Sequence, residues 1–312
     1  MKHFRFWIFI FHFSFFIFHC LYATEPTAEF LRINPAATAS AIGGADVAYS
    51  GKVDSIYSNP SGLGTLAKPQ LLTAYSSYIQ NIKLAGLAFA KPIGKKGENV
   101  VGLAVLYLGL TGLEVYNDDS GATGETASSS NFGFTLSWAR NIRNNLTAGL
   151  SIKQVHQNYD EVTSDGFCAD VGVLYKSNNL SLGLSFQNFG PEIDNQKLPS
   201  TIRLGTNYTD YIFNNIPIET SVEIEKPIYS DIKFKAGAEY WITPNVNLRC
   251  GYEDLKAAGT FSGISGGLGL KTFYQQSYIE ENMKKIDVNL DYAFTYFGEL
   301  GNIHKVSIGF EF

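Results

Sequence analysis

The sequence predicts an all-β protein, a transmembrane antiparallel β-barrel of about 14 strands with an N-terminal plug, or hatch, segment. Three observations predict this fold class. In roughly the last 80 residues, apolar and polar residues alternate with a period of two, which is typical of β-strands. The apolar parity carries no charge in any of these stretches, and the chain ends on the aromatic residue Phe312.

The alternation is clearest in the stretches 232–242, 246–253, 286–296 and 304–312. In the first of them, Phe234 and Tyr240 lie on the apolar parity, whereas Lys233 and Lys235 lie on the other. A soluble antiparallel sheet can alternate in the same way, so a β-sandwich is the alternative. Since a charge on a lipid-facing strand position costs about 2–4 kcal/mol at the membrane midplane, the charge-free parity favours a barrel with a wet interior.

The composition suits a barrel and excludes some partners. Charged residues make up 17 % of the chain and aromatic residues 14 %, with 18 Tyr and 30 Gly. Tyr suits membrane interfaces, and Gly allows strands to twist and kink. Without Lys2 and Arg5, 22 basic residues (24 − 2) face 29 acidic ones, and no basic block occurs. We therefore expect no nucleic-acid partner.

The cysteines and the potential metal ligands are uninformative about chemistry. Cys168 and Cys250 could form one disulfide, but Cys250 falls on the lipid-facing parity, so two free thiols are favoured. No cluster of His, Cys, Asp and Glu has metal-ligand spacing, and we expect no metal and no cofactor.

Residues 1–23 are predicted to be a signal peptide. Lys2 and Arg5 precede the apolar run Phe6–Phe18, and Ala23 offers a cleavage position. The run is too short to cross about 30 Å of hydrocarbon as a helix. Export together with a barrel pattern predicts the outer membrane of a Gram-negative cell, with its lipid as a partner.

Residues 24–66 show no strand alternation and are predicted to fold back into the lumen as the hatch. Ala36–Ile42 is expected to be a short helix after Pro35, Val47–Tyr49 a brief extended piece, and Asn59–Gly62 a turn. Several apolar residues in this region argue against the alternative, a disordered tail.

Residues 67–312 are predicted to form the barrel wall. The strands are expected at 70–79, 82–92, 98–110, 130–140, 146–157, 166–176, 179–187, 200–209, 216–226, 232–242, 245–253, 260–272, 284–296 and 303–312. Short and longer connections mostly alternate, as they do in bacterial barrels. The connections 80–81 and 273–283 break this rule.

The expected strand at 98–110 is apolar on both parities. Lipid explains an outward apolar face, but an inward one needs a plug segment or an apolar ligand against it. Leu103 and Val105 are the candidate residues of an apolar lumen wall. Gly109 and Gly112 follow where a strand would kink or bulge.

Three N-terminal motifs carry a resemblance, namely Phe30–Ile33, Ala41–Ala48 and Ile56–Leu63. They resemble the N-terminal signature of the PorV/PorQ family of outer-membrane barrels, which is similar in fold to the FadL-type long-chain fatty acid transporters. The candidate plug-motif residues are Gly43, Gly44, Asn59, Pro60 and Gly62. The resemblance implies a hatch at 24–66 and a lateral gate at a kink in the third strand, matched here by Gly109 and Gly112.

Two functions follow as hypotheses. The first is a passive channel for hydrophobic small molecules, in which the ligand contacts the inner face of 100–110 and leaves sideways into lipid. The second, also implied by the resemblance, is an interaction protein that docks secreted proteins or a type IX secretion translocon through the loops 111–129 and 188–199. Inward charges such as Lys235 and Arg249 could tune conductance, contact the hatch or hold the wall in register.

Catalysis is not expected. The histidines beyond the predicted signal peptide are His156 and His304, both at strand ends. Asp160 and Ser164 lie near His156 in the sequence, but a loop rich in Ser, Asp and Glu produces such proximity by chance.

Overall fold

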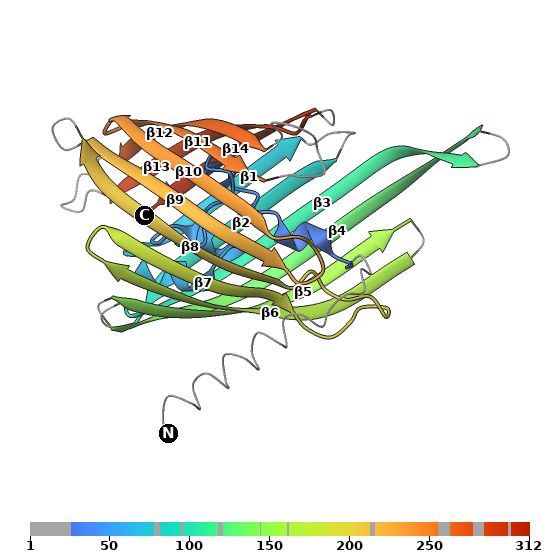
Figure 1. Ribbon diagram of the computed structural model, residues 1–312, viewed down its shortest axis with the longest axis horizontal. Helices are drawn as coiled ribbons and strands as arrows, with labels where there is room; N and C mark the ends of the chain where they lie inside the picture. The colour runs from blue at the N-terminus through green and yellow to red at the C-terminus, as the bar shows by residue number, and fades with distance from the viewer. Residues whose placement is uncertain are drawn as a thin grey trace, which may run out of the picture.

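The structure is a computed structural model that describes residues 26–77, 82–94, 97–117, 121–143, 145–160, 162–212, 216–254, 263–276, 284–298 and 301–312. These residues form a closed barrel of 14 antiparallel strands (Figure 1). Pairing of the first strand with the last closes it, with Gln70 opposite Glu311 and Ser77 opposite His304. Closure leaves no open sheet edge, so every wall strand has two neighbours. The predicted fold class is confirmed, whereas the predicted signal peptide lies outside the described residues.

The strands follow the chain around the barrel as β1 (Gln70–Ser77), β2 (Lys83–Ile93), β3 (Asn99–Asn117), β4 (Gly121–Arg143), β5 (Leu146–Tyr159), β6 (Val162–Ser177), β7 (Leu180–Phe189), β8 (Thr201–Ile212), β9 (Ile216–Pro227), β10 (Lys233–Thr243), β11 (Val246–Glu253), β12 (Ile264–Gln276), β13 (Lys284–Tyr296) and β14 (Asn302–Glu311). Strand β12 lies four residues later than predicted. Its glycines blur the alternation, and its register is set by pairing with β11, where Tyr252 faces Ile264.

The predicted loop 111–129 is wrong. Strand β3 continues into it as far as Asn117 and β4 begins at Gly121, and the two strands pair, with Tyr116 opposite Ala122. This hairpin extends well beyond the other strands (Figure 1). Its Ser, Thr and Gly residues lack an alternating apolar face, and the sequence pattern therefore hides the strands.

The alternation of the wall separates two environments. Phe234, on the outer face of β10, is 55 % exposed, whereas its neighbour Lys235 is 7 % exposed and points into the lumen. The same parity holds in β11, where Leu248 is exposed and Arg249 is buried. An apolar outer surface around a polar interior is what a lipid-facing barrel requires.

The hatch, residues 26–66, lies within the barrel (Figure 1). Its helices are η1 (Glu29–Arg32), α2 (Ala37–Ala41), η2 (Val53–Tyr57) and η3 (Pro60–Thr65). The short helix predicted after Pro35 is present as α2, but Val47–Tyr49 is a turn and not an extended piece. The N–H of Tyr49 donates to the carbonyl of Asp46 at 3.1 Å. Within the described part of the chain, no helix has the length and apolarity needed to span a bilayer.

Candidate functional site

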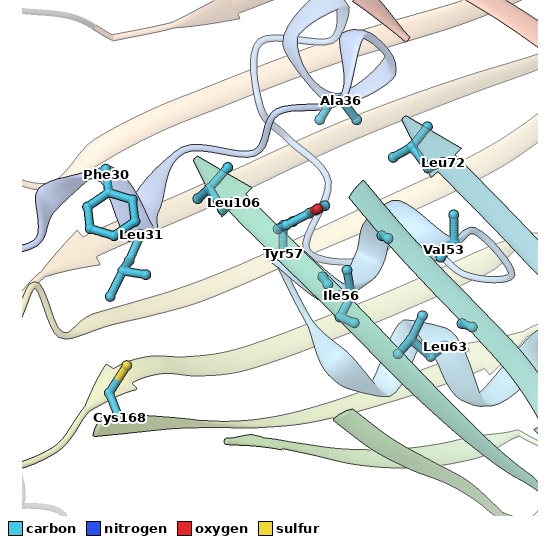
Figure 2. Close-up of a cluster of buried hydrophobic side chains, with 14 of the residues drawn as sticks. Phe30, Leu31, Ala36, Val53, Ile56, Tyr57, Leu63, Leu72, Leu106 and Cys168 are labelled. Carbon is cyan, nitrogen blue, oxygen red and sulfur yellow. The ribbon is translucent and has the colours of Figure 1, made fainter. Parts of the chain in front are cut away.

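The hatch packs against one apolar side of the lumen, formed by the inner faces of β1–β5. Ile56 and Leu63 of the hatch are fully buried in a cluster with Leu106 of β3 (Figure 2). A Cβ atom on Gly102 of β3 would lie 3.0 Å from Ile56 Cδ1 and 3.2 Å from Leu63 Cδ1. The sequence left two occupants for an inward apolar face on β3, a plug segment or an apolar ligand. In the structure the plug segment lies against it.

The lumen wall predicted at Leu103 and Val105 is corrected by the structure. Leu103 is 56 % exposed on the outer face of the barrel, and Val105 shares its parity. The inward residues of β3 are Val100, Gly102, Ala104, Leu106 and Leu108. Because β3 is apolar on both parities, its sequence does not say which parity faces in; pairing with β2 and contact with the hatch decide it.

A belt of inward glycines gives the hatch its space. For each of these glycines, a Cβ atom would come within 3 Å of a hatch atom: Gly86, Gly149, Gly172, Gly183, Gly205, Gly237, Gly251 and Gly267. Gly237 faces Ile42, and Gly251 meets the backbone at Gly43. The wall therefore approaches the hatch at backbone distance around most of the lumen.

The predicted plug-motif residues shape the hatch. Gly43 and Gly44 adopt φ of 65° and 71°, which side chains disfavour. Asn59 caps η3: its Oδ1 accepts from the N–H of Ser61 at 3.1 Å, and its Nδ2 donates to the carbonyl of Val47 at 2.8 Å. Pro60 is the first residue of η3.

Gly62, the fifth plug-motif residue, allows two parts of the hatch to meet. A Cβ atom there would lie 2.7 Å from the Tyr49 carbonyl oxygen and 2.8 Å from Ser55 Cβ. All five motif residues thus determine how the hatch folds, and their contacts are structural.

Buried ion pairs join the hatch to the charged side of the lumen, the inner faces of β8–β14. Arg203 of β8 binds Asp46 of the hatch and Glu223 of β9, each at 2.6 Å, and donates to the carbonyl of Gly44 at 2.9 Å. Glu223 also accepts from the N–H of Val47 at 2.9 Å. Removing one member would leave a buried charge unpaired, which typically costs about 3–5 kcal/mol.

Two further ionic contacts hold the hatch. Arg32 binds Glu225 of β9 at 2.8 Å. Lys52 lies 3.9 Å from Glu239 of β10, and Glu239 also binds Arg249 of β11. Sequence analysis placed these wall charges in the lumen but missed their hatch partners, because more than 150 residues separate pairs such as Asp46 and Arg203 and no local signal connects them.

The hatch also carries perturbed titratable groups. Burial raises the pKa of the Tyr57 hydroxyl and that of the Asp54 carboxyl above their ordinary values. Burial by itself would lower the pKa of Lys52, but the carboxylates of Glu239, Glu219 and Asp54 together outweigh it, and the net pKa is raised. Lys52 therefore stays charged next to Glu239.

Three cavities lie between the hatch and the charged side. The outer cavity, about 390 Å³, lies near the rim that carries the longer loops; the inner cavity, about 230 Å³, lies near the opposite rim. A third, of about 10 Å³, lies between them. The outer cavity has one apolar flank, formed by Phe30, Ile33, Leu108, Phe297 and Ile303.

The predicted kink in the third strand is a bulge. Leu110 pairs with Ser129 and Leu113 with Ala127, so β3 has one residue more than β4 in this interval. Gly112 lies in it with a φ of 74°, and a Cβ atom there would meet nothing within 4 Å. Gly109 lies before the bulge, against the ring of Tyr107.

The segment 188–199, predicted as an exposed docking loop, is partly folded into the barrel. Ile193 and Leu198 are buried in the same cluster as Phe30 of the hatch. The N–H of Thr27 donates to the carbonyl of Lys197 at 2.9 Å. Two apolar residues of this loop therefore serve packing, whereas Phe189 is exposed and remains available to a partner together with the polar residues.

The side chains considered for catalysis, His156 and Ser164, bond to different partners. His156 contacts Asp165 at 2.9 Å, while Ser164 donates to Asp194. Cys168 is buried and Cys250 exposed, and both are free thiols. Within the described ranges, no three His, Cys, Asp or Glu side chains gather as metal ligands would.

Solved structures share this architecture. The toluene transporter TbuX of Ralstonia pickettii has a TM-score of 0.61 at 14 % identity, with 91 % of this chain and 98 % of that chain covered. The toluene transporter TodX of Pseudomonas putida has a TM-score of 0.57 at 12 % identity, covering 88 % and 95 %. A FadL homologue of Pseudomonas aeruginosa has a TM-score of 0.56 at 10 % identity, covering 88 % and 97 %.

Identities this low show that the fold is shared, and they do not show that the function is shared. No protein-family model and no curated protein matches the sequence. The resemblance to the PorV/PorQ family therefore stays a prediction. What the comparisons show is a 14-stranded barrel of the kind found in FadL-type transporters.

Proposed function

We propose that the protein is an outer-membrane channel for hydrophobic small molecules, which releases its ligand sideways into the membrane. Its fold is that of the hydrocarbon transporters TbuX and TodX. Its outer face is apolar, and its lumen is filled by a hatch that blocks a straight aqueous path for a large solute. A ligand that enters from the loop rim must therefore leave through the wall.

On this route the ligand first binds at the apolar flank of the outer cavity. Phe30 and Ile33 of the hatch and Leu108 of β3 form it together with Phe297, which follows β13, and Ile303 of β14. A cavity of about 390 Å³ lies within the range of small-molecule sites, about 300–1,000 Å³. A monoaromatic hydrocarbon is the probe that the fold relatives suggest.

The observation that carries the proposal is the position of Leu108. Its side chain lines the outer cavity, and the β3 bulge begins only two residues later, at Leu110. A bulge interrupts the ladder between β3 and β4, which is where a wall of paired strands can part most easily. Leu108 thus connects the ligand cavity to the weakest place in the adjoining wall.

Deletion of Gly112 tests the lateral route, because it removes the extra residue and restores one-to-one pairing between Leu110 and Glu114. The matched control deletes Ile142, the extra residue of a bulge that β4 forms near its far end, opposite β5. Labelled toluene uptake is measured in cells that lack their own hydrocarbon channels, at equal amounts of heat-modifiable barrel. We expect uptake above the empty vector for the wild type and the control, and background uptake for the Gly112 deletion.

The two parts of the proposal fail separately. Wild-type uptake equal to the empty vector contradicts a hydrocarbon channel. If the Gly112 deletion takes up toluene as fast as the wild type, the lateral gate is contradicted, whereas the hydrocarbon channel is not.

The protruding β3–β4 hairpin favours docking of a protein partner as a second candidate function (Figure 1). Replacing residues 114–126 by a short turn keeps the Leu113–Ala127 pair that bounds the bulge, and it should leave toluene uptake intact under the channel proposal. Crosslinked partners from outer membranes that disappear with this hairpin would instead favour docking of secreted proteins or of a secretion translocon.

A further inference from the structure

We propose that the charged side of the lumen holds a continuous water-filled passage past the hatch, whose narrowest point is a site for a single water molecule. This passage is separate from the hydrophobic route above. It would make the barrel permeable to water while the hatch stays in place. The inference rests on the three cavities and on the polar groups that face the smallest of them.

Neighbouring cavities share wall residues. The outer and middle cavities share Ala39 and Asp46 as walls. The middle and inner cavities share Thr38, Lys52 and Asp54. One chain of cavities therefore runs from the loop rim to the opposite rim.

The middle cavity has the volume of one water. Its volume of about 10 Å³ matches the 10–15 Å³ that one water needs as probe-occupied space. Tyr49, Ser55 and Ser58 line it, and the hydroxyl of each is buried without a hydrogen-bond partner among the described residues. A buried water makes about three hydrogen bonds, so a single molecule there satisfies all three hydroxyls.

Lys52 sets the width of the constriction. Its Nζ lies 4.7 Å from the centre of the Tyr49 ring and 3.9 Å from Glu239. The side chain is 35 % exposed and faces the inner cavity. Glu239 keeps its ion pair with Arg249 when this side chain is shortened, so Lys52→Ala should widen the passage without leaving that carboxylate unpaired.

The opposite side of the hatch supplies a matched control. Ser137 of β4 and Ser151 of β5 are buried on the apolar side, and their hydroxyls bond each other at 2.6 Å. Neither lines any of the three cavities. Replacing both by Ala removes two buried hydroxyls that already satisfy each other, which is nearly neutral.

The test is osmotic shrinkage of proteoliposomes that contain the full mature chain, followed by stopped-flow light scattering. The double variant Tyr49→Phe/Ser58→Ala removes two of the three unpaired hydroxyls that would bind the water and leaves the middle cavity open. We expect wild type and Ser137→Ala/Ser151→Ala to shrink at least about twofold faster than protein-free vesicles, and the double variant to shrink more slowly than wild type. Lys52→Ala should shrink about twofold faster than wild type.

Several results would overturn the passage. Wild-type vesicles that shrink no faster than protein-free ones exclude it, as does a folded double variant with wild-type permeability. If the double variant loses heat-modifiable mobility, it has not folded, and Lys52→Ala becomes the test. Water permeability of Lys52→Ala equal to that of the wild type would then reject the constriction. Osmotic shrinkage does not depend on toluene uptake, so failure of the water passage and failure of the channel proposal can be told apart.

Discussion

At the scale of single residues, Tyr57 shows how the hatch is fastened to a wall that has few free backbone groups. Its hydroxyl donates to the carbonyls of Leu87 and Val105 at 3.0 and 3.2 Å, and these two residues face each other across β2 and β3. The ring packs in the buried cluster (Figure 2). One side chain thereby joins the hatch to two neighbouring strands through both apolar and polar contact.

Replacing Tyr57 by Phe should lower the free energy of unfolding by about 1 kcal/mol, the usual net value of a buried hydrogen bond. The ring and its packing are retained, so the loss comes from the hydroxyl alone. Urea unfolding of the barrel in lipid vesicles measures it, and Tyr252→Phe, on the exposed outer face of β11, is the control. Equal midpoints for the two variants would contradict a fastening role.

At the scale of elements, the hatch and the glycine belt are sterically complementary. Gly149 of β5 meets the backbone of Pro60, the residue that begins η3. Gly266 of β12 is a glycine of the same wall without such a neighbour: its nearest atom to a Cβ would be the Arg249 carbonyl oxygen at 3.7 Å. Position relative to the hatch, and not strand geometry, explains why Gly149 cannot carry a side chain.

Gly149→Ala should therefore loosen the hatch, with a destabilisation of about 1–3 kcal/mol, as expected for overpacking. Gly266→Ala should be close to neutral, because the new methyl group makes an ordinary contact. Limited proteolysis of the barrel in vesicles reports cleavage within residues 26–66, and we expect faster cleavage only for Gly149→Ala. Equal protection of both variants would show that the hatch adjusts to a methyl group there.

At the scale of the whole molecule, the wall could be predicted from sequence and the interior could not. Strands such as β10 carry charge on one parity alone, because lipid and water impose opposite demands on the two faces. In β3 both faces are apolar, one against lipid and one against the hatch, so Leu103 could not be told from Ala104. The contact of Asp46 with Arg203 depends on closure of the entire barrel, which no local pattern encodes.

The closed wall should also be able to exist without its hatch. All 14 strands satisfy their backbone groups within the wall, and lumen charges such as Arg249 pair with the wall residues Glu239 and Asp291. Deletion of residues 26–66 removes the apolar cluster and the plug together, but water can hydrate the glycine belt that becomes exposed. We expect the deleted protein to insert as a heat-modifiable barrel whose single-channel conductance in planar bilayers is severalfold above that of the full chain. Failure to form a barrel under conditions that fold the full chain would mean that the hatch is a folding nucleus as well as a plug.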